Sequence, residues 1–251
     1  MRFAIVTGVS KGLGYDISKV LTELNIDVIG LSRSTNETVE NLIKSSNGQF
    51  THIPMDLINV DEIESLIKEV CHQILARKPQ KVYVFNNASM IEPIERLGYL
   101  DNNLIQQAIN LNLVAPLFIN NSLLKILRNE DIELVIVNIT SSAAERPIYG
   151  WNIYNGTKAA INMHTKVAGL EQESINASHK IVGFNPGLMD TDMQGTIRGA
   201  DQDAFTEIDK FLNFKKNGDL RPSRDVAKAL MDIILSENLI NGKIYSINEI
   251  L

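Results

Sequence analysis

The chain opens with MRFAIVTGVSKGLG, residues 1–14, and this stretch predicts the fold. Phe3–Thr7 is a short apolar run rich in β-forming residues, so we expect it to be a buried strand. Glycines at positions 8, 12 and 14 predict a tight turn, and apolar residues then recur at helical spacing over 13–24. A strand, a glycine turn and a helix in this order are typical of a nucleotide-binding α/β unit.

The glycine turn has the features of a phosphate-binding loop. Glycines let the backbone approach a pyrophosphate, and the N-terminus of the next helix offers free N–H groups and positive partial charge. The spacing is Gly-x-x-x-Gly-x-Gly rather than Gly-x-Gly-x-x-Gly, and a plain turn is the alternative. The residues expected to bind the cofactor here are Gly8, Ser10, Lys11, Gly12, Leu13 and Gly14.

Apolar strands and amphipathic helices alternate along the rest of the chain. Further strands are expected at 27–31, 51–55, 81–85, 133–139, 180–184 and 243–247. Further helices are expected at 36–45, 60–77, 101–127, 152–172 and 225–235. This alternation predicts one α/β domain over 1–251, a doubly wound Rossmann-type fold with a parallel sheet of about seven strands and helices on both faces. The polar, mixed segment 190–220 interrupts the alternation where a substrate lid would lie, so we expect a lid there.

Composition excludes several classes of protein. The 251 residues are 44% hydrophobic with a net charge of −6, and a nucleic-acid binder would show a basic patch instead. No apolar run reaches membrane-spanning length and no signal peptide precedes the first strand, so we expect a cytoplasmic protein. The single cysteine, Cys71, lies in a helical apolar pattern, and the four histidines lack ligand spacing. We therefore expect no disulfide and no metal site.

The end of the second strand indicates which dinucleotide binds. NAD-binding proteins carry an Asp or Glu about 20 residues past the loop, where it bonds the ribose 2′-hydroxyl. This chain has an arginine, Arg33, at the corresponding place, and a guanidinium can bind a 2′-phosphate with two parallel hydrogen bonds. Lys11 is a second nearby cation, so NADP(H) is expected over NAD(H). A solvated turn residue is the alternative for Arg33.

Tyr154 and Lys158 suggest the chemistry. Four residues apart on a helix, they share one face, and a buried cation makes a phenol more acidic. Ser141, thirteen residues upstream of Tyr154, follows a strand and could hold a carbonyl oxygen beside the phenol. The three residues outline a site that reduces C=O, although Tyr-x-x-x-Lys alone also fits an ordinary amphipathic helix with a solvated lysine.

Taken together, motifs along the chain resemble the short-chain dehydrogenase/reductase family over essentially its full length. The motifs are residues 7–14, Asp56-Leu57, Asn86-Asn87-Ala88-Ser89, Asn112, Ser141, Tyr154-x-x-x-Lys158 and Asn185-Pro186-Gly187. The segments 137–142, 186–194 and 241–249 are similar to the branch of sepiapterin reductases and bacterial benzil reductases. One departure is Ser89, where the family has glycine. Another is Glu249, where sepiapterin reductases place an aspartate that holds the pterin.

The resemblance implies an NADPH-dependent carbonyl reductase of a small ketone or diketone. It assigns Tyr154 as the proton donor and Lys158 as the residue that binds the nicotinamide ribose and lowers the pKa of the tyrosine. Ser141 would orient the carbonyl oxygen, with Ser142 as the reserve candidate. Asn112 would anchor a water that relays protons from Lys158. A 3-oxoacyl thioester reductase and a non-catalytic NADP(H)-binding regulator are the alternatives.

The resemblance also implies the remaining contacts. The further cofactor-binding residues are Asp56, Asn87, Ala88, Pro186, Gly187 and Thr191. The substrate residues, suggested by aromatic and methionine side chains that suit a flat dicarbonyl, are Trp151, Tyr149, Met189 and Met193, with Glu249 at the tail. An acid in the place of Asp56 is as often a helix cap. Family members are usually homo-oligomers, so a dimer or tetramer is expected.

Overall fold

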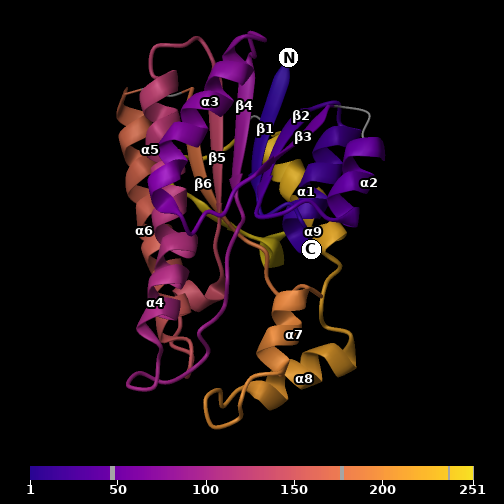
Figure 1. Ribbon diagram of the computed structural model, residues 1–251, viewed down its shortest axis with the longest axis vertical. Helices are drawn as coiled ribbons and strands as arrows, with labels where there is room; N and C mark the ends of the chain where they lie inside the picture. Colours follow the sequence, from indigo (N-terminus) through magenta and orange to yellow (C-terminus); the bar gives the residue numbers. More distant parts are fainter. Residues whose placement is uncertain (46–48, 176–177, 237, 251) are drawn as a thin grey trace.

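A computed structural model describes residues 1–45, 49–175, 178–236 and 238–250, and its centre is a parallel sheet of seven strands (Figure 1). The strands are β1 (Arg2–Thr7), β2 (Asp27–Ser32), β3 (Phe50–Pro54), β4 (Lys81–Asn86), β5 (Glu133–Ile139), β6 (Lys180–Asn185) and β7 (Ile244–Ser246). Their order is β3-β2-β1-β4-β5-β6-β7, so the winding reverses between β1 and β4. The prediction of a doubly wound sheet is confirmed, and ligands of such sheets bind at the carboxyl ends beside this reversal.

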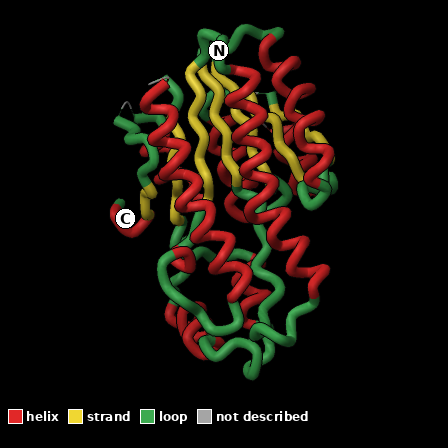
Figure 2. Tube along the Cα trace, turned by 90° about the vertical axis from the view of Figure 1, so that its left-hand side faces the viewer, coloured by secondary structure: helices red, strands yellow, loops and turns green. Residues whose placement is uncertain are grey.

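Helices cover both faces of the sheet (Figures 1 and 2). One face carries α1 (Gly12–Glu23), α2 (Glu37–Ser45) and α9 (Ser223–Ile234). The other carries α3 (Ile63–Leu75), α5 (Ala115–Leu127) and α6 (Asn152–Ile175). The inner strands β1, β4 and β5 are buried on both faces, so their sequences are nearly continuous apolar runs rather than alternations. Among the described helices, none combines the length and hydropathy needed to cross a membrane.

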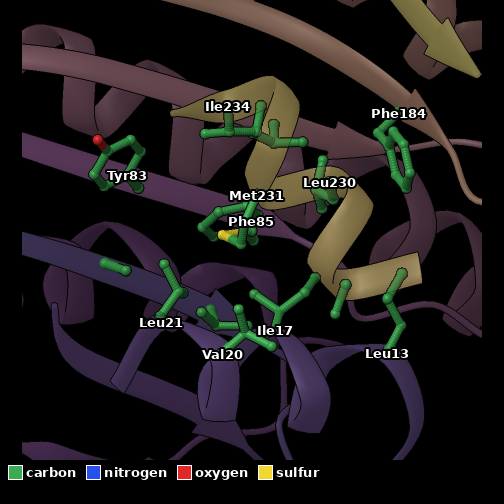
Figure 3. Packing of buried hydrophobic residues seen from close by; sticks show 14 of the residues in the cluster. Leu13, Ile17, Val20, Leu21, Tyr83, Phe85, Phe184, Leu230, Met231 and Ile234 are labelled. Carbon is green, nitrogen blue, oxygen red and sulfur yellow. The ribbon is translucent and has the colours of Figure 1, made fainter. Parts of the chain in front are cut away.

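The core on the first face shows how the helices are held. Figure 3 shows Ile17 and Leu21 of α1 beside Leu230 and Ile234 of α9, all packed over strand residues such as Phe85. Burying one such side chain contributes about 1.5–3 kcal/mol to folding. This packing places the N-terminus of α1, and with it the glycine turn, at the carboxyl edge of β1.

The helix predicted over 101–127 is more complex than its sequence indicates. It consists of α4 (Asn102–Ile109), a π-helical turn (Asn110–Val114) and α5, with Pro116 in the first turn of α5. Proline lacks an N–H donor and crowds the preceding turn, so a wider turn before it relieves the conflict. The consequence for the site is that Asn112 lies in the irregular turn.

The segment 190–220, predicted as a lid from its polarity, folds into α7 (Asp192–Arg198) and α8 (Ile208–Asn217). In Figure 1 both helices extend below the sheet, past the carboxyl ends of the strands. Four apolar residues of the segment, Ile197, Phe205, Ile208 and Phe211, are buried in a cluster that also contains Trp151 and Tyr154. This aromatic cluster is separate from the two clusters on the sheet, and it joins the segment to the helix that carries Tyr154.

Candidate active site

Two glycines of the turn pack too closely against their neighbours to carry a side chain, and the third does not. Gly8 has φ +74°, and a Cβ added there would meet the Asn87 side chain at 2.9 Å. A Cβ on Gly14 would collide with the carbonyl oxygen of Gly8. Gly12 has φ +58°, and a Cβ added there would make ordinary van der Waals contact with the Thr191 methyl at 3.6 Å. Glycine is therefore required at 8 and 14 to seat the loop, and Gly12 faces Thr191.

The N-terminus of α1 fits an anion. Lys11 is its N-cap, with extended backbone and no side-chain capping bond, and the first turn holds no acidic residue. Uncapped N–H groups at a helix N-terminus attract phosphate oxygens. These groups fit the phosphates of a dinucleotide.

Arg33 and Lys11 lie in different surroundings. The Gly8 N–H donates to the Leu31 carbonyl at 2.7 Å, which brings the end of β2, and the exposed Arg33 just past it, beside the loop. Lys11 instead pairs with Asp192 of α7 at 2.8 Å. Both partners of this pair are about 70% exposed, and such surface pairs contribute at most about 1 kcal/mol. The sequence did not indicate this link between the loop and the lid.

Ser141, Tyr154 and Lys158 lie together at the carboxyl end of β5. Tyr154 is hydrogen-bonded to the Ser141 hydroxyl, which also accepts the Ala143 N–H at 3.1 Å. The Lys158 ammonium donates to the Ile139 carbonyl at 3.0 Å and lies 5.6 Å from the centre of the Tyr154 ring. Ser142 is exposed, so the hydroxyl that reaches the tyrosine is that of Ser141.

Burial controls the ionisation of this group. It raises the pKa of Tyr154 to about 12, while the hydrogen bond with Ser141 acts in the opposite direction. Burial also lowers the pKa of Lys158 to about 8, and no described carboxylate pairs with that ammonium. Removing water disfavours the charged form of each group. The expectation of an acidic tyrosine is thus wrong for the protein alone, because burial raises the pKa of Tyr154 by more than the hydrogen bond with Ser141 lowers it.

Asn112 is anchored by its side chain. Its Oδ1 accepts the Ser89 hydroxyl at 3.0 Å and the Met90 N–H at 2.9 Å, and its Nδ2 donates to the Met90 carbonyl at 2.8 Å. Asn112 and Lys158 line the same small cavity, together with Asn86 and Asn138. The structure thus brings Asn112 and Lys158 to one polar space, although the carboxamide itself holds the loop after β4 in place.

Asn87 and Ala88 connect β4 to the glycine turn. Asn87 Nδ2 donates to the Thr7 carbonyl at 2.9 Å, and both backbone N–H groups donate to the Thr7 hydroxyl at 2.9 Å. Asp56 forms a local bond of the capping kind, since its Oδ1 accepts the Ile58 N–H at 3.1 Å. Asp56, Asn87 and Ala88 therefore shape the edge on which the cofactor is expected.

Tyr154 packs against an aromatic cluster. Trp151 packs edge-on against Tyr154, with ring centres 5.4 Å apart, and stacks on Phe205 at 5.2 Å. Phe211 contacts both Trp151 and Phe205. Phe205 and Phe211 were not predicted from the sequence, although apolar residues at 197, 205, 208 and 211 were a signal inside the polar segment.

The other predicted substrate residues are dispersed. Met193 packs against the aromatic cluster, whereas Met189 packs against the core over the sheet. Tyr149 is 46% exposed. The apolar residues next to Tyr154 are therefore Trp151, Phe205 and Phe211, and all three are buried.

Near the C-terminus, Ile247 and Asn248 both approach Gly187, and the atom nearest to an added Cβ there is Ile247 Cγ2 at 2.8 Å. A Cβ on Gly187 would meet Arg221 Nη1 at 3.3 Å and Asn248 Oδ1 at 3.5 Å. The predicted Glu249 is exposed at the end of a short 3-10 turn, Ile247–Glu249. Arg221 and Asn248 were missed because they lie 34 and 61 residues along the chain from Gly187, and only folding brings them to it.

Comparison with known proteins agrees with this geometry. A sequence profile of the family described as short chain dehydrogenase matches residues 2–202. The chain is 34% identical to a benzil reductase ((S)-benzoin forming) of Bacillus subtilis over 100% of both chains. It is 26% identical to a sepiapterin reductase of Bos taurus, over 95% of this chain and 91% of that one.

A solved structure shares the fold. The crystal structure of a short-chain dehydrogenase/reductase from Saccharomyces cerevisiae superposes with a TM-score of 0.80 at 24% identity, over 98% of this chain and 96% of that one. The profile match and the full-length identity together establish the family of the chain. The chain belongs to the short-chain dehydrogenase family of oxidoreductases, in the branch that contains the benzil and sepiapterin reductases.

Proposed function

We propose that the protein is an NADPH-dependent carbonyl reductase that acts on small ketones or diketones. The observation that carries this proposal is the grouping of Ser141 with the buried Tyr154 and Lys158 at the sheet edge that also holds the glycine turn. Trp151 is 5% exposed and its ring packs edge-on against Tyr154, so the surroundings of the phenol are aromatic, as a flat substrate would favour. Relatives named benzil reductase support a diketone as the first substrate to test.

The proposed mechanism uses each residue in a distinct role. NADPH, when bound, supplies a hydride to the carbonyl carbon. The glycine turn and the N-terminus of α1 hold the phosphates, and Arg33 binds the 2′-phosphate. Ser141 donates a hydrogen bond to the carbonyl oxygen, and Tyr154 donates its proton to that oxygen as negative charge develops. Lys158 stabilises the tyrosinate that remains and binds the nicotinamide ribose.

The ionisation of the site agrees with this direction of proton transfer. With a pKa near 12, Tyr154 is protonated at pH 7, as a proton donor must be. Lys158, with a pKa near 8, is still largely charged at pH 7. A charged lysine beside a neutral tyrosine is the state from which reduction starts.

We also propose that 190–220 is the substrate lid and that the protein is a homo-oligomer. Buried lid residues complete the aromatic cluster around Tyr154, which supports the first proposal. The family resemblance supports the second, as do exposed apolar side chains at Met163, Val167 and Leu170 on one face of α6. Sedimentation equilibrium tests the second proposal, and a strictly monomeric protein would contradict it.

The experiment that tests the proposed function is an NADPH-oxidation assay with benzil, sepiapterin and an acetoacetyl thioester. Turnover of benzil or sepiapterin but not the thioester is expected. Tyr154→Phe should lower kcat by about 10²–10⁴-fold, the usual effect of losing a general acid, and should leave NADPH binding unchanged. Tyr99→Phe, at a tyrosine that is 68% exposed and has no assigned role, is the matched control. Retained turnover in Tyr154→Phe would refute the assigned role.

Cofactor preference is tested separately. Arg33→Asp removes a guanidinium and adds a charge that repels a 2′-phosphate, so the ratio of kcat/KM for NADPH to that for NADH should fall about tenfold or more. An unchanged ratio would mean that the phosphate contact lies elsewhere.

A further inference from the structure

We propose that His52 is a positioning residue for NADPH selection, because it holds the β2–α2 loop in the conformation that presents Arg33 to the 2′-phosphate. This inference rests on the proposed cofactor preference. It adds a residue on β3 that contacts neither the glycine turn nor the sites assigned above.

The imidazole of His52 bridges the two ends of the short turn that contains Arg33. His52 Nε2 lies 2.8 Å from the Ser32 hydroxyl, and Nδ1 lies 2.9 Å from the Thr35 hydroxyl. Ser32 directly precedes Arg33, and Thr35 follows it by two residues. One rigid ring therefore fixes the distance between the two backbone points on either side of the arginine.

Strand register explains why a residue on β3 reaches this turn. His52 pairs with Gly30 of β2, and Ser32 pairs with Pro54. Ser32 lies two residues after Gly30, so His52 and Ser32 lie on the same face of the sheet and one step of the register apart. Thr35 then folds back over the end of β3 and completes the bridge.

A histidine is well suited to this bridge. The neutral ring has one donor and one acceptor nitrogen, and a hydroxyl can serve as either partner. Burial lowers the pKa of His52, which favours the neutral ring at pH 7. Neither nitrogen is left without a partner, so the ring has one defined orientation.

The far end of the loop is attached to the phosphate-binding turn. Asn36 Nδ2 donates to the Ser10 carbonyl at 3.2 Å, and Asn36 Oδ1 accepts the Val39 N–H at 2.9 Å, which caps α2. The loop is thus held by β3 on one side and by the glycine turn on the other.

Arg33 itself is held only by its backbone. Its side chain is exposed and forms no ion pair or hydrogen bond with any residue in the described part of the chain. Where the guanidinium points therefore depends on the backbone of the loop that His52 fixes. Ordering a loop on binding costs free energy, and a loop that is ordered in advance avoids that cost.

The first test measures binding of each cofactor to the purified protein by calorimetry, so it needs no substrate. His52→Ala should raise the Kd for NADPH about fivefold to tenfold, which is about 1–1.4 kcal/mol, and should change the Kd for NADH less than about twofold. Thr51→Ala is the matched control, because Thr51 neighbours His52 on β3, is exposed and should change neither Kd. Equal weakening of NADPH and NADH, or no change in either, would overturn the inference.

The second test asks whether His52 acts through Arg33. In the Arg33→Asp protein, His52→Ala should cause no further loss of NADPH preference, because the cation that the loop presents is gone. An additional loss of similar size would show that His52 acts independently and would overturn the inference. If Arg33→Asp alone leaves the NADPH/NADH ratio unchanged, the proposed cofactor preference fails instead, whatever His52→Ala does.

A third variant covers the case in which His52→Ala does not fold. Thr35→Val keeps the ring and removes only one of its two hydroxyl partners, at an exposed position. It should weaken NADPH binding selectively, by a smaller factor than His52→Ala. Unchanged NADPH binding in folded Thr35→Val would contradict the bridge as the source of selectivity.

Discussion

At the scale of single residues, Ser141 and Ser142 show how position decides a role. The two serines are adjacent in the sequence, yet only Ser141 bonds to Tyr154, and Ser142 is exposed in the 3-10 turn that follows. Ser141 also caps that turn through the Ala143 N–H, which fixes its rotamer. A hydroxyl held in this way is preorganised to bind a developing oxyanion.

We therefore expect unequal effects of removing the two hydroxyls. Ser141→Ala should lower kcat about 10²–10³-fold, the cost of losing one oxyanion donor, and Ser142→Ala should change it less than about twofold. Steady-state NADPH oxidation with the best diketone measures both. Equal losses would mean that the two hydroxyls share the role.

Lys158 has a proposed role that requires a buried charge, and burying that charge destabilises the folded protein. Its ammonium is buried with one carbonyl partner and no described counter-ion, and its pKa falls from 10.5 to about 8. A base whose pKa is lower in the folded state destabilises that state below its folded pKa. The penalty is constant below pH 8 and disappears as the pH rises from 8 to 10.5.

Lys158→Met should therefore be more stable than the wild type while losing turnover. We expect a gain of about 1–3 kcal/mol in the free energy of unfolding at pH 7, because the variant no longer buries a charge. The gain is limited because the Ile139 carbonyl loses its hydrogen-bond donor. Urea unfolding of the cofactor-free proteins at pH 7 and pH 10 measures it, and the gain should shrink at pH 10. A lower free energy of unfolding for Lys158→Met at pH 7 would show that the charged lysine does not destabilise the folded state.

At the scale of elements, the turn before α6 controls how the lid docks. Gly150 has φ +82°, and a Cβ there would collide with the carbonyl of Ala204. The same stretch carries Phe205, which stacks on Trp151. The turn at Gly150 and the stretch at Ala204, 54 residues apart in the chain, can therefore lie in close contact only because residue 150 has no side chain.

Gly150→Ala should displace the lid and lower both stability and activity. A positive φ and a backbone collision together should cost about 1–3 kcal/mol or more. Gly156→Ala is the matched control, because nothing lies within 4 Å of an added Cβ in the α6 helix. It should be neutral or stabilise by up to about 1 kcal/mol. Urea unfolding and NADPH oxidation of both variants test the contrast.

At the scale of the whole molecule, the cofactor edge is assembled from distant parts of the chain. The glycine turn follows β1, Arg33 follows β2, Asn87 follows β4, and Thr191 precedes α7, yet all lie at one edge of the sheet. The Lys11–Asp192 pair also joins the first loop to the lid. A ligand that contacts all of these parts should stabilise the fold as a unit.

NADPH should therefore protect the protein from thermal unfolding more than NADH does. At a concentration of 100 times its Kd, a ligand adds about 2.7 kcal/mol, which is about 5–11 °C in Tm for a chain of this size. Differential scanning fluorimetry with equal concentrations of the two cofactors measures this, and Arg33→Asp should remove the difference. Equal shifts in the wild type would contradict the NADPH preference.

Much of this molecule can be read from its sequence. The strand over 133–139 was predicted at its observed bounds, and the doubly wound sheet is confirmed, because buried strands in a parallel sheet must be continuously apolar. The glycine turn and the Tyr154–Lys158 pair were also recognisable. Their function depends on short spacings along one strand–turn–helix unit or one helix face, and such spacings are visible in a sequence.

Only the tertiary structure decided the rest. Local spacing did not predict that burial would raise the pKa of Tyr154, that Phe205 would stack on Trp151, or that Asn248 rather than Glu249 would approach Gly187. Nor did it show that His52 bridges Ser32 and Thr35. The pKa of Tyr154 depends on how completely folding excludes water from its side chain, and the contacts depend on which distant segments of the chain pack together. Sequence alone determined the local geometry, and the three-dimensional packing of the chain determined the environment in which that geometry works.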